Sequence, residues 1–182
     1  MTPGGIAVGT LAWEPALERP ELLAAPVVAA LREWPHAGDV AVAEIDPRLA
    51  DTAEFSATYE VPLDASANCV VVAGRRAGEE RVAACVVLAT TRADVNSVVR
   101  RQLDVRKASF LATDDAVERS GMEYGGITPV GLPGTWPVLV DAAVLGVAVA
   151  VVGSGVRRSK LALPGRLLAE LPRGRVVEGL AR

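Results

Sequence analysis

The sequence contains few of the side chains that hold transition metals or act as nucleophiles. Its 182 residues include two cysteines and a single histidine, His36. With no cluster of cysteine and histidine, neither a metal site nor a cofactor is expected. A Ser-His-Asp arrangement would depend on His36 alone, in an expected loop. Cys69 and Cys85 each lie in an apolar run, which favours buried small side chains over a disulfide or a catalytic thiol.

Long apolar runs are also absent. The longest, residues 142–152, is interrupted by Gly146 and is shorter than the roughly 18 residues of a membrane span. The N-terminus lacks the basic segment and apolar run of a signal peptide. These features predict a cytoplasmic protein without a membrane partner. The length of 182 residues suits one domain with a sizeable core.

Lysines and aromatic residues are scarce, and the charge is distributed unevenly. Aromatic residues make up 4% of the chain, and Lys107 and Lys160 are the only lysines. Residues 1–64 carry a net charge of −8, whereas residues 65–182 carry +5. The basic C-terminal part is consistent with a local anionic partner, or simply with uneven surface charge.

What is abundant is alanine and valine, within a hydrophobic content of 51%. This composition suits tightly packed strands and short helices, and periodicity places them. Helices are predicted over residues 26–34, 52–59 (capped by Asp51), 94–103, 113–119 and 164–171. Strands are predicted over residues 40–45, 107–111, 137–141, 147–152, 159–163 and 175–177, with a hairpin of residues 68–73 and 81–88 around a turn at 74–80. The predicted fold class is α+β, a single domain with a mixed, partly curled sheet flanked by short helices.

Three irregular segments follow predicted strands or helices. The first is the glycine loop, Gly125 to Gly131. Two adjacent glycines and Pro129 predict that it is rigid. It is either a structural turn or a loop whose N–H groups face a ligand. The second is Asp141, interpreted as a general base or, preferably, as a carboxylate that holds the loop. The third, residues 153–155, lacks the spacing of a nucleotide-binding loop. Loops at strand ends can line one pocket.

Residues 119–131, with the glycine loop at their end, resemble the signature of the YbaK/prolyl-tRNA synthetase-associated domain family. The predicted hairpin, the helix after Asp94, the strand ending at Asp141 and residues 153–155 occur in the family's order. The resemblance covers roughly residues 40–180. It implies a YbaK-like aminoacyl-tRNA editing domain over residues 40–182, with residues 1–39 as a lead-in and helix of the same domain.

The resemblance implies hydrolysis of the ester that joins a wrong, small amino acid to a tRNA, with the acceptor end as partner and a tRNA synthetase as a further candidate. An activated ester needs positioning and oxyanion stabilisation more than a strong nucleophile. Arginines of the basic part are expected to contact the phosphates. The expected catalytic residues are Asn68, Gly125, Gly126 and Asp141. The expected substrate-binding residues are Ala67, Ile127, Thr128, Pro129, Gly131, Gly153, Ser154 and Gly155.

One position departs from the family pattern. The resemblance implies a lysine at the start of the strand that contains Asn68, and Ala67 occupies that position. Lys107 and Lys160 lie elsewhere in the sequence, and neither is expected to substitute. The leading hypothesis is therefore an aminoacyl-tRNA deacylase, weakened by Ala67. The alternatives are a non-catalytic module that binds tRNA or a synthetase, and a pocket for a free nucleotide or amino acid.

Overall fold

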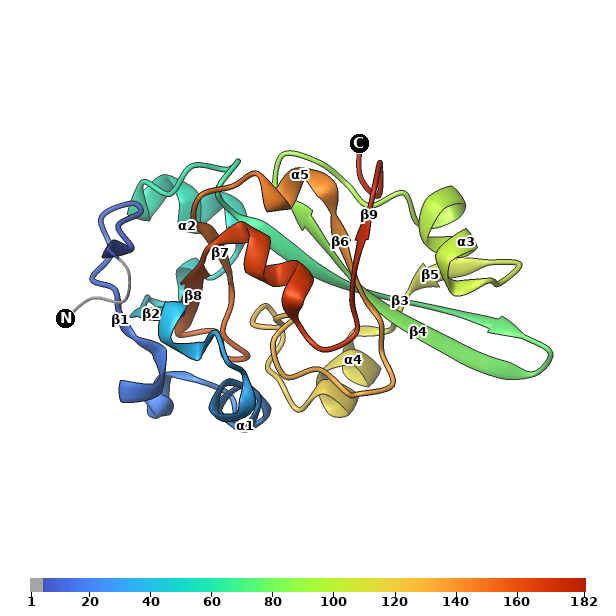
Figure 1. Ribbon diagram of the computed structural model, residues 1–182, viewed down its shortest axis with the longest axis horizontal. Coiled ribbons are helices and arrows are strands. Elements are labelled where there is room, and N and C mark those ends of the chain that lie inside the picture. Colours follow the sequence, from blue (N-terminus) through green and yellow to red (C-terminus); the bar gives the residue numbers. More distant parts are fainter. Residues whose placement is uncertain (1–4) are drawn as a thin grey trace.

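The computed structural model describes residues 5–182 as a single α+β domain with two β-sheets and short helices (Figure 1). The α+β class is as predicted, but the sheet is in two parts rather than one curled sheet. Within residues 5–182, none of the helices has the length and apolar character needed to cross a bilayer.

The first sheet has four antiparallel strands, in the order β1 (Glu14–Pro15), β2 (Ala41–Glu44), β8 (Ser159–Leu163) and β7 (Ala150–Gly153). All five residues of β8 are buried, which explains the apolar sequence of the last three, Leu161 to Leu163. The two polar residues of the strand are Ser159 and, as its one charged residue, Lys160. It pairs with Gly153 of β7 on one side and with Ala43 of β2 on the other.

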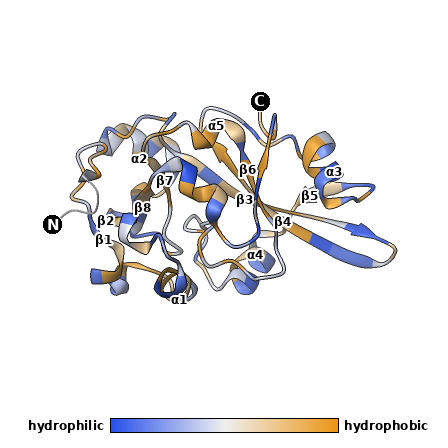
Figure 2. Ribbon diagram, in the orientation of Figure 1, coloured by the Kyte–Doolittle hydropathy of each residue, from blue (hydrophilic) through white to orange (hydrophobic). Residues whose placement is uncertain are grey.

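The second sheet is mixed, in the order β5 (Ala108–Phe110), β3 (Ala67–Arg76), β4 (Glu79–Leu88), β6 (Val138–Asp141) and β9 (Gly174–Val177). The hairpin of β3 and β4 is longer than predicted, because its turn is only Ala77 and Gly78. Both residues have positive φ, 52° and 85°, as a tight two-residue hairpin turn requires. The far end of this hairpin is hydrophilic and extends beyond the rest of the sheet (Figure 2).

The helices are short. The α-helices are α1 (Ala25–Glu33), α2 (Thr52–Tyr59), α3 (Arg100–Leu103), α4 (Thr113–Ser120) and α5 (Ala142–Leu145). The 3₁₀ segments are η2 (Ala16–Glu18), η3 (Pro20–Leu22), η4 (Ala37–Asp39), η5 (Pro47–Leu49) and η7 (Gly165–Glu170), and η6 (Val95–Val99) is a π-turn.

Several predicted element boundaries are corrected by the structure. Asp94 caps its helix as expected, accepting from the Ser97 N–H at 3.0 Å, but the first turn is the π-turn η6. Asp51 stands at the N-cap of α2 without a capping hydrogen bond; its carboxylate lies 3.5 Å from Arg157 instead. The strand predicted over 147–152 begins only at Ala150, because Val147 closes a turn onto Val144. The helix predicted over 164–171 is the 3₁₀ segment η7.

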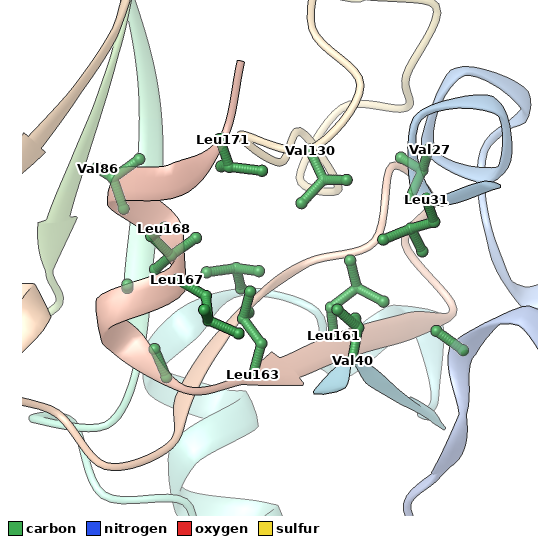
Figure 3. Packing of buried hydrophobic residues seen from close by; sticks show 14 of the residues in the cluster. Val27, Leu31, Val40, Val86, Val130, Leu161, Leu163, Leu167, Leu168 and Leu171 are labelled. Atoms are coloured by element: carbon green, nitrogen blue, oxygen red, sulfur yellow. The ribbon is translucent and has the colours of Figure 1, made fainter. Parts of the chain in front are cut away.

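The largest core cluster joins both ends of the chain to the glycine loop. Val27 and Leu31 of α1 are fully buried in it, together with Leu167 and Leu168 of η7, and Val130 of the glycine loop belongs to the same cluster (Figure 3). The packed side chains therefore fix one end of the glycine loop against α1 and η7.

The two sheets meet at the start of β3. Ser66 forms a parallel bridge with Val151 of β7, and the Val151 N–H donates to the Ala65 carbonyl at 2.7 Å. This junction brings the beginning of β3 beside β7. The pocket described next opens at this junction.

Candidate functional site

A pocket of about 390 Å³ opens where the two sheets meet the glycine loop. Its wall comes from the turn before α2 and from α2 itself, the start of β3, the end of β5, the beginning of α4, the glycine loop, and strands β7 and β8. Five of the predicted site residues line it. They are Ala67, Asn68, Gly125, Ile127 and Gly153.

Asn68 is held in the wall by a side-chain hydrogen bond. Its carboxamide oxygen accepts from the Thr52 hydroxyl at 2.9 Å, and Thr52 also lines the pocket. Because this bond uses the oxygen, the NH₂ group is the part of Asn68 that can donate to a ligand.

The glycine loop is tightly constrained by the turn between β7 and β8. A Cβ on Gly126 would lie 2.7–2.8 Å from backbone atoms of Val156, so only glycine fits there. The Gly126 carbonyl accepts from the Gly155 N–H at 2.8 Å. The Gly126 N–H was expected to face a ligand; instead it donates to the Glu123 carbonyl at 2.9 Å, because it closes the turn.

The segment Gly153-Ser154-Gly155 holds the glycine loop. Gly153 lies against the carbonyls of Gly126 and Ile127, where a Cβ would come within 2.4 and 2.7 Å of the two oxygens. Ser154 is fully buried, and its hydroxyl is 2.7 Å from that of Ser159. Ser154 and Gly155 were expected to bind substrate, but their hydrogen bonds hold the β7–β8 turn against the loop. Gly153 alone of the three lines the pocket.

Asp141 does not hold the glycine loop. Its two carboxylate oxygens accept from the Ala143 N–H, at 2.9 Å, and from the Ala181 N–H, at 2.8 Å. The carboxylate thus caps α5 and fastens the C-terminal segment. The sequence pattern correctly places Asp141 at the end of a buried strand, but it carries no information on which N–H groups surround that end.

Three further predicted residues face away from the pocket. Pro129 and Gly131 line a second pocket of about 370 Å³, with Trp34 and Trp136. Thr128 is fully buried, and its hydroxyl has no hydrogen-bond partner within residues 5–182. The glycine loop therefore separates two pockets, with Gly125 and Ile127 on one side and its second half on the other.

Sequence reasoning missed Lys160, whose side chain lines the first pocket. Its amine donates to the Ala50 carbonyl at 2.9 Å and lies 5.1 Å from the centre of the Phe55 ring. Burial lowers the pKa of this amine from 10.5 to about 8; the charge of Arg157 acts in the same direction, and Asp51 opposes it. A lysine in a predicted strand, followed directly by three apolar residues, was the available signal.

The mouth of the pocket carries two aromatic rings, and an arginine lies over one of them. Phe110, at the end of β5, and Tyr124, beside the glycine loop, both line the pocket, and each is 62% exposed. Arg157 donates to the Pro47 carbonyl at 3.2 Å, and its guanidinium lies 5.6 Å from the centre of the Tyr124 ring. Arg157 therefore links the turn before α2 to the glycine loop.

Cys69 also lines the pocket. Burial raises the pKa of the Cys69 thiol far above its usual range, and the neighbouring Cys85 adds to this effect. The thiol of Cys69 is therefore protonated at neutral pH, and it serves as a small apolar part of the wall rather than as a nucleophile.

Several arginines of the basic part are paired with acids. Arg76 and Arg81 both pair with Asp104, and Arg119 pairs with Glu80. These pairs reduce the positive field near the turn end of the β3–β4 hairpin. The excess of positive charge read from the sequence is thus partly neutralised within the fold.

Comparison with known proteins assigns the family. The model of the aminoacyl-tRNA editing domain family matches residues 46–171, well over half of the chain. The protein therefore belongs to the aminoacyl-tRNA editing domain family. A comparison with curated proteins gives no match.

Solved structures show the same fold. One is a candidate trans-editing enzyme for prolyl-tRNA synthetase, 19% identical, with a TM-score of 0.71 over 91% of this chain and 96% of the other. Another is a hypothetical protein, 23% identical, with a TM-score of 0.67 over 78% of this chain and 90% of the other. At these identities the similarity establishes the fold alone.

Proposed function

We propose that the protein is a trans-editing aminoacyl-tRNA deacylase, which hydrolyses the ester between a small, wrongly attached amino acid and the 3′ end of a tRNA. The observation that carries the proposal is the pocket of about 390 Å³, lined by Asn68, Gly125 and Gly153 in a chain of the editing-domain family. A pocket of this volume is of the size that binds a small ligand, here an aminoacyl group with its terminal ribose.

The residues of the pocket fit ester hydrolysis without a covalent intermediate. A water oxygen bonds to the carbonyl carbon, the bond to the ribose oxygen breaks, and the released ribose hydroxyl takes up the proton. In this proposal the NH₂ group of Asn68 orients the ester or the water. Cys69, with its raised thiol pKa, does not compete as the attacking group.

The two exposed rings suit the unpaired 3′ end of a tRNA. Unpaired bases stack on aromatic side chains whatever their identity, and Phe110 and Tyr124 lie at the mouth of the pocket. In this arrangement the rings hold the last bases while the aminoacyl group enters the pocket.

The test is hydrolysis of charged tRNA. Purified protein is incubated with tRNA for proline charged with alanine or cysteine, and with serine-charged tRNA, and release of amino acid is compared with spontaneous hydrolysis. We expect release from at least one of them, reduced about 10-fold or more in Asn68→Ala, because a positioned donor is lost. Asn96→Ala, which changes an exposed asparagine in η6, is the matched control and should be unaffected.

Release no faster than the spontaneous rate on every charged tRNA would exclude the deacylase. Binding of uncharged tRNA in that case would support the alternative function, a non-catalytic module that docks on tRNA.

A further inference from the structure

Lys160 is a buried cation without an acidic partner. The residue is only 9% exposed, and within residues 5–182 none of the ion pairs includes it. The acid that influences its pKa, Asp51, pairs with Arg157 at 3.5 Å. Burying a charge without a paired opposite charge costs stability. A lysine at this position therefore indicates a ligand that interacts favourably with the positive charge.

The contacts of the amine leave donors for a ligand. An ammonium group has three N–H donors, and the Ala50 carbonyl, 2.9 Å away, accepts from one of them. On another side lies the face of the Phe55 ring, 5.1 Å from the amine. The side chain lines the pocket, so its remaining donors are available to a group that enters there.

The strand pairing connects Lys160 to the glycine loop through Gly153. Lys160 pairs with Gly153, and Gly153 packs against the carbonyls of Gly126 and Ile127. Ala67 lines the same pocket from β3. Two positions on different strands, 67 and 160, can therefore carry a side chain into one cavity.

We propose that Lys160 is a catalytic residue of this pocket, whose ammonium donates a hydrogen bond to the carbonyl oxygen of the substrate ester and stabilises the negative charge that forms there. The inference rests on the proposed deacylase function. As water adds to the carbonyl carbon, the oxygen becomes negative next to the ammonium. When the bond to the ribose oxygen breaks, the electron pair on the carbonyl oxygen re-forms the double bond. The electrons of the broken bond leave on the ribose oxygen, which takes up the proton lost by the water, and Lys160 stays protonated throughout. Fixed charges aimed at a developing oxyanion are among the largest contributions to catalysis.

The test compares variants of Lys160 on the best charged tRNA. Lys160→Met keeps the length of the side chain and removes the charge; we expect kcat to fall by about 100-fold or more while KM changes little. Lys160→Arg should retain part of the activity. The double variant Ala67→Lys, Lys160→Met moves the charge to the other strand. Its kcat should be at least about 10-fold higher than that of Lys160→Met. Lys107→Met, which changes an exposed lysine, should behave as the wild type.

Two further readouts separate catalysis from a structural role. Thermal unfolding should show Lys160→Met at least as stable as the wild type, because an unpaired buried charge is removed. In the wild type, enzyme-dependent hydrolysis should decline as the pH rises through about 8, where the ammonium loses its proton; in Lys160→Arg this decline should be absent. The charged groups around the amine are Arg157 and Asp51, and Cys69 shares the pocket.

The outcomes distinguish this inference from the proposed function. Hydrolysis by the wild type together with undiminished kcat in Lys160→Met would overturn the role of Lys160 and leave the deacylase standing. Inactivity of the wild type on all charged tRNAs would overturn both. Reduced stability of Lys160→Met, with hydrolysis falling only in proportion to the folded fraction, would assign Lys160 a structural role instead.

Discussion

Single residues in this protein show how closely the pocket depends on glycine. Gly153 is the clearest case, since the β7 strand lies against two carbonyls of the glycine loop and leaves no room for a side chain. Gly153 lies in a strand, where glycine is normally unfavourable, and close packing of one backbone on another explains its presence.

Gly153→Ala should therefore displace the glycine loop. Its Cβ would come within 2.4 Å of the Gly126 oxygen, and relieving such overpacking typically costs about 1–3 kcal/mol. We expect a corresponding loss in the free energy of unfolding, measured in urea, and a larger loss of hydrolysis than the loss of stability explains. Gly38→Ala, where an added Cβ has nothing within 4 Å, is the control. Wild-type hydrolysis in Gly153→Ala would show that the loop position does not matter.

Asp141 illustrates the limit of reading roles from single residues. Its position at the end of a buried strand predicted a general base or, preferably, a carboxylate that holds the glycine loop. The structure shows that both oxygens are used by backbone N–H groups of α5 and of the C-terminal segment. A residue 40 positions further along the chain decides what this carboxylate does.

At the level of elements, the end of β5, the beginning of α4 and the glycine loop form the mouth of the pocket. Each contributes side chains from a different part of the chain, Phe110 and Thr113 from one side and Tyr124 from the other. The helical elements here are short and irregular, so their positions depend on packing against the sheets rather than on helix propensity.

The two aromatic rings should act on binding rather than on chemistry. Phe110→Ala combined with Tyr124→Ala should raise KM for charged tRNA, because stacking is worth about 1–3 kcal/mol per base, and should leave kcat within a few-fold. Replacement by leucine should recover little, since an aliphatic side chain has no flat π-face. Equal KM in the alanine double variant and the wild type, measured at the same salt concentration, would contradict the stacking arrangement.

For the molecule as a whole, the N-terminal part belongs to the same core as the pocket. Val27 and Leu31 of α1 are fully buried beside Val130 of the glycine loop. The Ala24 N–H donates to the Ser154 carbonyl at 3.2 Å, and the Ser159 hydroxyl donates to the Leu22 carbonyl. The family match begins at residue 46, yet the supports of the pocket begin earlier.

Removal of residues 1–39 should therefore abolish cooperative folding rather than trim a dispensable extension. A milder change, Leu31→Ala, should lower the free energy of unfolding by about 2–5 kcal/mol, as measured by urea denaturation. Glu33→Ala, which changes an exposed residue of the same helix, should have little effect. A truncated protein with a sharp unfolding transition and unchanged hydrolysis would show that residues 40–182 suffice.

The sequence alone predicted most helices and strands, because periodicity, glycine and proline act on neighbouring residues. It also selected Asn68, Gly125 and Gly153, all of which line the pocket, and its resemblance led to the editing-domain family. Packing between distant segments decided the rest. Lys160 meets Ala50, 110 positions away, only because β8 pairs between β2 and β7. Such contacts depend on strand order and sheet junctions, which local sequence signals do not encode.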